Sequence, residues 1–85
     1  MHYEIFVQEG PVQARYKETF KTADAAEYYA KHTTDGKYWV YRVDDSGETE
    51  VARGSGEPLL SQRGKEVPVG TIMLRARKMD QGAKK

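Results

Sequence analysis

A chain of 85 residues is enough for one small domain, and the lack of cysteine excludes a disulfide framework and a thiolate metal site. The formal net charge of +1 excludes the charge excess that keeps a chain unfolded, and six tyrosines with Trp39 supply apolar area for a core. Residues 1–50 carry ten acidic and six basic side chains, whereas residues 51–85 carry three and eight. We therefore expect an acidic body followed by a basic C-terminal third.

The first twenty-one residues predict an antiparallel hairpin. Residues 2–8 alternate as a half-buried strand does, with Phe6 as an apolar residue on the second face. The turn Glu9-Gly10-Pro11 separates this strand from a second one over residues 12–21. In the second strand Tyr16 and Phe20 share one face, and basic side chains occupy the other.

A short helix follows the hairpin. Thr22 suits an N-cap because its hydroxyl can accept a hydrogen bond from an unpaired amide of the first turn. Ala26, Tyr29 and Ala30 recur at helical spacing and form a narrow apolar stripe. Alanine in this stripe predicts that the helix lies close on a sheet.

The second half of the chain predicts three further strands. Residues 37–43 are rich in aromatic and β-branched residues, and an Asp-Asp-Ser-Gly turn leads to a polar strand over residues 48–53. A loop over residues 54–66 precedes a fifth strand at 67–76, in which Ile72, Leu74 and Ala76 alternate and Pro68 favours a sheet edge. Residues 78–85 predict a disordered, basic tail.

These elements predict a single α+β domain over residues 1–77, with its ordered body at 2–53. The order is ββαββ, an antiparallel sheet with one helix packed on one face and a fifth C-terminal strand.

One helix covers only one face of a sheet, so the other face meets water or a partner. If Trp39, Tyr41 and Val43 point toward the helix, Tyr38 and Arg42 point away from it. An ordinary solvated sheet also shows alternating basic residues, so this pattern alone leaves two interpretations open. As a recognition surface, the face predicts a partner-binding set of Arg15, Lys17, Lys21, Tyr38 and Arg42.

Catalytic motifs are missing from the sequence. His32 near the helix end and His2 at the start have no acidic or nucleophilic neighbours at a catalytic or ligand spacing. We therefore expect no enzyme activity, no metal site and no cofactor. The N-terminus lacks a signal-peptide pattern, and no run approaches the length of a membrane span. We expect the protein in the cytoplasm of a cell or of a host cell.

The segment at 17–30 (KETFKTADAAEYYA) resembles a pattern in the arm-type DNA-binding domains of phage integrases and in a plant DNA-binding domain. That resemblance implies a sheet inserted into a DNA groove, with Arg15, Lys17 and Lys21 on the DNA side. The strand–strand–helix–strand order is also similar to small phage inhibitors of host RNA polymerase and to some anti-CRISPR proteins. That similarity implies a non-catalytic inhibitor.

Two function classes remain open. The first is a protein-binding module, an inhibitor or adaptor, because Tyr, Trp and Arg are the residues that carry interface energy. The alternative is a nucleic-acid-binding module, with net charge near zero against it and the basic C-terminal third in its favour. It predicts a DNA- or RNA-binding set of Arg15, Lys17, Lys21, Arg75, Arg77 and Lys78. Either class is compatible with a monomer or a homodimer.

Overall fold

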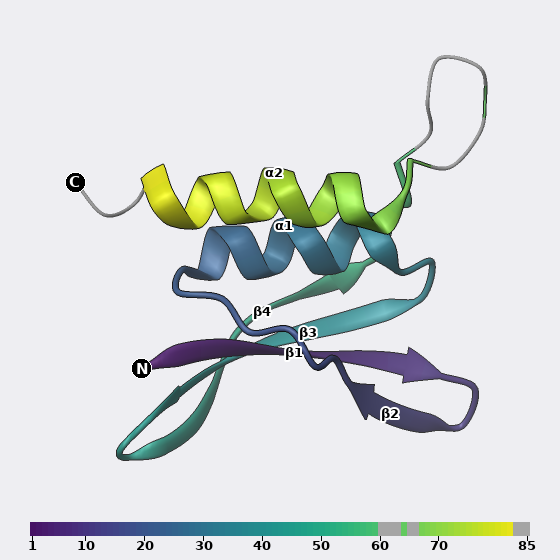
Figure 1. The fold of residues 1–85 in the computed structure, drawn as a ribbon. Helices are drawn as coiled ribbons and strands as arrows, with labels where there is room; N and C mark the ends of the chain where they lie inside the picture. Colours follow the sequence, from purple (N-terminus) through teal and green to yellow (C-terminus); the bar gives the residue numbers. More distant parts are fainter. Residues whose placement is uncertain (60–63, 65–66, 83–85) are drawn as a thin grey trace.

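The computed structural model describes residues 1–59, 64 and 67–82, which form a sheet and a layer of two helices (Figure 1). The elements in chain order are β1 (His2–Glu9), β2 (Val12–Arg15), α1 (Ala23–Thr33), β3 (Lys37–Asp44), β4 (Gly47–Ser55) and α2 (Val69–Gly82). The predicted α+β class is confirmed, as are the antiparallel sheet and the helix packed on one face of it.

The strands pair antiparallel in the order β2-β1-β3-β4, so the first and third strands lie in the centre of the sheet. Gly10 lies in the turn between β1 and β2, and Gly47 begins β4 directly after the turn between β3 and β4. Their φ angles are 58° and 117°, a region where a side chain is strained. The second strand is shorter than predicted, because its ladder ends at Arg15. Phe20 then rejoins β1 through two backbone hydrogen bonds with Tyr3, of 2.8 and 3.1 Å.

The first helix, α1, begins where the sequence predicts. Thr22 is its N-cap, and the Thr22 hydroxyl accepts a hydrogen bond of 3.2 Å from the Ala25 amide. The buried stripe consists of Ala25 and the three predicted residues Ala26, Tyr29 and Ala30. The small alanine side chains allow α1 to pack closely on β1, β3 and β4.

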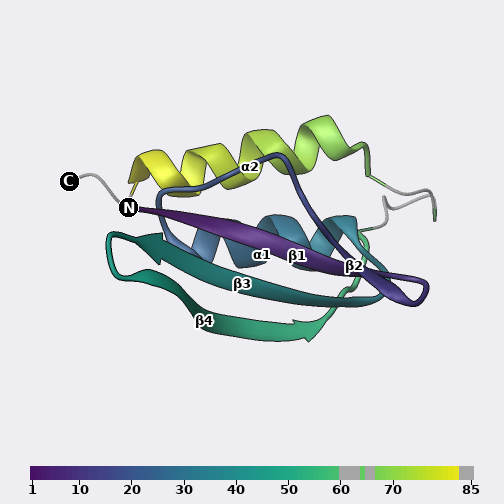
Figure 2. The same cartoon turned by 90° about the horizontal axis from the view of Figure 1, so that it is seen from below.

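The predicted fifth strand at residues 67–76 is wrong, because α2 begins at Val69. It continues to Gly82, so the disordered tail predicted from residue 78 is wrong as far as Gly82. Residues 83–85, and residues 60–63 and 65–66 of the predicted loop, lie outside the described part of the chain. The two helices run antiparallel, side by side, on the same face of the sheet (Figures 1 and 2).

The sequence between Ile72 and Asp80 fits two periodicities, which explains this error. Ile72, Leu74 and Ala76 alternate as in a strand, but Ile72, Ala76 and Asp80 also recur every fourth residue. The exposed fractions distinguish the helix from the strand. Ile72, Ala76 and Asp80 are 1%, 0% and 4% exposed, whereas Leu74 is 66% exposed. The segment buries a helical stripe against α1 and leaves Leu74 in water.

The predicted orientation of β3 is also wrong. Tyr38 and Val40 are 3% and 0% exposed and belong to the core under the helices. They pair with Val7 and Ile5 of β1, and these aliphatic residues fix which face is buried. Trp39 and its alternate neighbours therefore point to the opposite face of the sheet.

Gly54 makes room for the Tyr38 side chain. It lies directly opposite Tyr38 on β4, and a Cβ atom on Gly54 would come within 2.8 Å of the Tyr38 hydroxyl oxygen. The hydroxyl passes over this position and donates a hydrogen bond of 2.9 Å to Glu27 Oε2 on α1. A glycine on β4 thus allows a tyrosine of the sheet to reach the helix.

Asp80 joins α2 to the N-terminus of α1. Its carboxylate is buried and accepts hydrogen bonds from the amides of Lys21 (3.0 Å) and Thr22 (3.2 Å) and from the Thr22 hydroxyl (2.9 Å). A negative charge is favourable at the N-terminus of a helix. The residue that caps α1 is therefore itself held by α2.

We expect Asp80→Ala to lower the free energy of unfolding by about 2–3 kcal/mol, because two amides and the capping hydroxyl lose a charged acceptor. Urea denaturation followed by circular dichroism measures this loss. Gln81→Ala changes an exposed neighbour on the same helix, and we expect its effect to stay within about 0.5 kcal/mol. Equal losses in the two variants would contradict the role of Asp80.

Candidate functional site: the open face of the sheet

Both helices lie on one side of the sheet, and Figure 2 shows the other side, which we call the open face. No other helix or strand of the described residues covers it. Successive side chains of a strand point to opposite faces of the sheet. The side chains of the open face therefore come from the positions that alternate with the core residues of each strand.

Four residues of the open face form a row that crosses all four strands. Arg15 of β2 is opposite Phe6 of β1, Phe6 is opposite Trp39 of β3, and Trp39 is opposite Arg53 of β4. We call this set the aromatic row. Its two aromatic side chains are half-buried at the centre of the sheet, and its two arginines are exposed at the edges. A flat apolar centre with a cation at each end is the result.

A second row, which we call the acidic row, lies next to the first along the strands. It consists of Glu4 of β1, Tyr41 of β3 and Glu50 of β4. The register of β3 and β4 shifts between Val40 and Tyr41, so β4 has one extra residue between the two rows. The Tyr41 ring meets the Phe6 ring edge to face, with centroids 5.3 Å apart, and connects the rows.

Ion pairs also connect the two rows. Arg53 Nε lies 3.1 Å from Glu50 Oε2, and an Arg15 guanidinium nitrogen lies 3.7 Å from Glu4 Oε1. The arginine side chains are 72% and 60% exposed, so these pairs are worth little to stability. Glu4 Oε1 is buried and accepts no hydrogen bond from the described residues. Because the two arginine side chains are mostly exposed, it costs little to exchange these partners for groups of a bound molecule.

Negative charge continues beyond the acidic row into the turn between β3 and β4. Asp44 accepts hydrogen bonds from the Ser46 hydroxyl (2.6 Å) and the Ser46 amide (2.9 Å). These bonds, with the nearby Arg42 guanidinium, hold the pKa of Asp44 below its ordinary value. Asp44 lies on the helix side of β3, as Arg42 does, whereas Glu48 lies opposite Val43 on the open face. The open face therefore has the aromatic row with its two arginines toward one end, and Glu4, Glu50 and Glu48 toward the other.

The structure does not bring the predicted partner-binding set together. Arg15 lies on the open face, and Lys17 is exposed just after β2 ends. Lys21 is exposed at the start of α1, where its amide binds Asp80 of α2. Tyr38 is buried under α1. Arg42 lies on the helix side of β3, where its Nε is 3.2 Å from Asp44.

The alternative basic set is divided between the sheet and the helix layer. Arg75 and Lys78 are exposed residues of α2, and α2 lies on the side of the sheet opposite the open face (Figure 1). Arg77 is held by the segment before α1: its guanidinium lies 4.5 Å from the centre of the Phe20 ring and donates to the Thr19 carbonyl at 2.7 Å. These residues do not share a surface with Arg15.

The sequence predicted Phe6 on the open face, but it did not predict Trp39, Tyr41 or the acidic row there. Residues 38–41 of β3 are all aromatic or Val, so alternation within the strand cannot show which face is buried. The useful signal lies in the neighbouring strands. Ile5 and Val7 mark the buried face of β1. Ala52 and Gly54, opposite Val40 and Tyr38, mark the positions of β4 on the helix side of the sheet.

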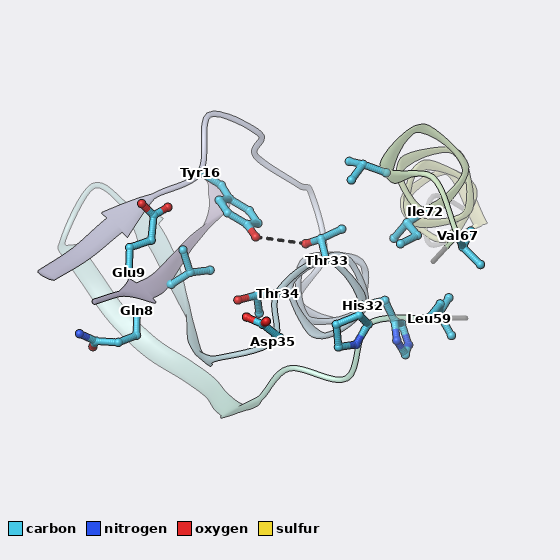
Figure 3. A pocket seen from close by; sticks show the side chains of 13 residues that line it. Gln8, Glu9, Tyr16, His32, Thr33, Thr34, Asp35, Leu59, Val67 and Ile72 are labelled. Carbon is cyan, nitrogen blue, oxygen red and sulfur yellow. Dashed lines mark hydrogen bonds between the residues drawn. The ribbon is translucent and has the colours of Figure 1, made fainter. Parts of the chain in front are cut away.

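A separate pocket of about 330 Å³ lies between the end of β1, the end of α1 and the start of α2 (Figure 3). The Thr33 hydroxyl donates to the Tyr29 carbonyl at 2.6 Å, so the Tyr16 hydroxyl, 3.3 Å away, donates to Thr33. His32 Nδ1 donates to the Glu57 carbonyl at 3.0 Å. These polar groups form hydrogen bonds within the protein. We therefore interpret the pocket as a gap where the sheet meets the two helices.

Two further properties of the described residues concern metal ions and membranes. No three of their His, Asp or Glu side chains gather closely enough to hold a metal ion. Neither helix is long and apolar enough to cross a membrane. A comparison with protein-family models, with curated proteins and with solved structures finds no significant match to this chain.

Proposed function

We propose that this protein is a non-enzymatic protein-binding module whose open face is the contact surface. It acts as an inhibitor or adaptor, of the kind that phages and mobile elements encode. The observation that carries the proposal is the aromatic row, in which Phe6 and Trp39 lie side by side between two arginines.

Residue types and position both support a protein partner. Trp, Tyr and Arg are enriched among the residues that dominate binding energy, and such residues cluster at the centre of an interface. Here Trp39 and Tyr41 lie on a central strand, with arginines at the rim. The rigid sheet also holds these side chains in place before binding, which lowers the entropy lost on association.

A nucleic-acid partner is the second candidate, because aromatic side chains on the central strands of a sheet can stack with bases. The charge order of the open face favours a protein instead. Glu4 and Glu50 lie one row from Trp39, where they would repel a phosphate backbone. The exposed basic residues Arg75 and Lys78 belong to α2, which lies on the side of the sheet opposite the open face.

We propose the cytoplasm of a cell or host cell as the site of this binding. A chain without cysteine needs no oxidising compartment to fold.

A photo-reactive amino acid at Val43, on the open face, should crosslink the partner in cells, whereas the same group at Leu74 on α2 should not. With the crosslinked partner purified, we expect Trp39→Ala to weaken binding at least about tenfold, because it removes the largest apolar side chain of the contact. Isothermal titration calorimetry measures this change. Leu74→Ala, a change of an exposed apolar side chain on the helix layer, should leave the affinity unaltered.

Two outcomes would overturn the proposal. Loss of binding in Leu74→Ala with retention in Trp39→Ala would move the contact to the helices. Binding of labelled single-stranded DNA or RNA that requires Trp39 and weakens steeply with salt would replace the protein partner by nucleic acid.

A further inference from the structure

The order of charges along the strands of the open face has a specific symmetry. The aromatic row carries two arginines, and the adjacent acidic row carries two glutamates. Both rows also carry aromatic side chains at the centre of the sheet. On β4 the two rows therefore carry opposite charges, and on β3 each row carries an aromatic side chain, whereas on β1 they carry Phe6 and Glu4.

A two-fold axis that lies between the rows and parallel to them would place each row against the other row of a second copy. Such an axis keeps each strand over its own counterpart and reverses the strand direction. Arg53 on β4 then faces Glu50 of the second copy, and Trp39 on β3 faces Tyr41 of the second copy. These two contacts form twice, once in each direction. The axis also places Phe6 on β1 against Glu4 of the second copy, and Arg15 on β2 faces no residue of the acidic row, so it stays with Glu4 of its own chain.

The other in-plane axis is unfavourable. A two-fold axis parallel to the strands would keep the rows in place and bring β2 over β4. Arg15 would then face Arg53 of the second copy, and like charges in contact are destabilising. The charge order therefore selects one face-to-face orientation.

We propose that the partner seated on the open face is a second copy of this chain, stacked sheet on sheet in the first orientation. The proposal rests on the protein-binding role of the open face and names the partner. Stacked sheets pack about 10 Å apart, a distance at which aromatic side chains of both faces interdigitate. The two arginine–glutamate contacts become a cluster of four alternating charges. The exposed pair between Arg53 and Glu50 within one chain already holds these side chains close to the required positions.

Sedimentation equilibrium between about 1 μM and 1 mM, the range of modest interfaces, should show a monomer–dimer equilibrium of the wild-type chain. We expect Arg53→Glu and Glu50→Arg each to weaken self-association at least tenfold, since each variant faces like charges in both contacts. An equimolar mixture of the two variants should form a heterodimer with nearly wild-type affinity, because both contacts then join opposite charges.

The mixture separates interface effects from folding effects. Both single variants lose the ion pair within the chain, so recovery in the mixture cannot come from restored monomer stability. The double variant Arg53→Glu/Glu50→Arg should also recover homodimerisation, since it exchanges both charges in each copy. Leu74→Ala on the helix layer should leave the dimer unchanged, and Trp39→Ala should weaken it.

A wild-type chain that stays monomeric up to about 1 mM, the upper end of that range, would overturn the proposal. A mixture that associates no better than the single variants would also overturn it. If a different protein crosslinks through Val43 while the wild-type chain stays monomeric, only self-association fails and the binding role of the open face stands. If neither association is found, both proposals fail.

Discussion

We expect Phe20→Ala to lower the free energy of unfolding by about 3–5 kcal/mol, the usual cost of removing a fully buried aromatic side chain. Phe20 is 1% exposed and lies where three parts of the fold meet. Its ring packs on Tyr29 of α1 with centroids 5.4 Å apart, and the Arg77 guanidinium of α2 covers it. Its backbone pairs with β1 at Tyr3. One truncation therefore weakens the attachment of both helices to the sheet.

Equilibrium unfolding in urea, followed by circular dichroism, measures the effect of Phe20→Ala. Leu74→Ala is the matched control, because Leu74 is a large apolar residue that is 66% exposed, and its loss should stay within about 0.5 kcal/mol. A Phe20→Ala variant whose stability equals that of the control would show that the segment before α1 does not close the core. A domain of this size has only a few kcal/mol to lose, so partial unfolding at room temperature would agree with the expectation.

The second expected result is a loss of stability at alkaline pH, between about pH 10 and 12. Burial raises the pKa of Tyr29 to about 12, and the charge of Glu18, which accepts the Tyr29 hydroxyl at 3.2 Å, adds to the effect. Burial also raises the pKa of Tyr38 to about 12, together with its hydrogen bond to Glu27. A tyrosine whose folded pKa exceeds its unfolded value near 10 stabilises the fold fully below pH 10. That stability is lost as the pH rises to the folded pKa.

Each tyrosine contributes up to about 2–3 kcal/mol to this loss, since one pKa unit corresponds to about 1.4 kcal/mol. Urea midpoints at pH 8, 10 and 11 should fall steeply above pH 10. Tyr38→Phe removes one titrating group, so the fall above pH 10 should be about half as steep in this variant. Tyrosinate absorbance should show the wild-type Tyr29 and Tyr38 ionising only as the protein unfolds. If stability falls above pH 10 as steeply in Tyr38→Phe as in the wild type, the Tyr38 hydroxyl of the wild-type protein is accessible to solvent in the folded state.

Local signals predicted most of the fold. The Thr22 cap, the alanine stripe of α1 and the turns at Gly10 and Gly47 each depend on a few neighbouring residues. These signals fixed the order of the first five elements. The α2 helix could not be predicted in the same way, because the spacing of Ile72 and Ala76 suits a strand and a helix equally until α1 is present to cover it.

The open face was harder to predict for a related reason. Both faces of β3 carry large apolar side chains, so their direction depends on Ile5 and Val7 in the adjacent strand. An incorrect direction moves every side chain of β3 to the wrong face. That is how Tyr38 entered the predicted binding set in place of Trp39. The rows themselves require the register of four strands, which no single segment contains.

The attachment of α2 also bears on motion within the folded state. Among the described elements α2 packs only on α1, and its polar ties to Thr19, Lys21 and Thr22 lie near its C-terminal end. The central strand β3, by contrast, is paired with a neighbouring strand on each side over most of its length. Amide hydrogen exchange should therefore detect α2 detaching as a unit at lower free energy than global unfolding. In that state the N-terminus of α1 loses Asp80, and the Phe20 ring is uncovered. The chain would then have a partly open form in which the sheet remains intact, together with the aromatic row and the acidic row on its open face.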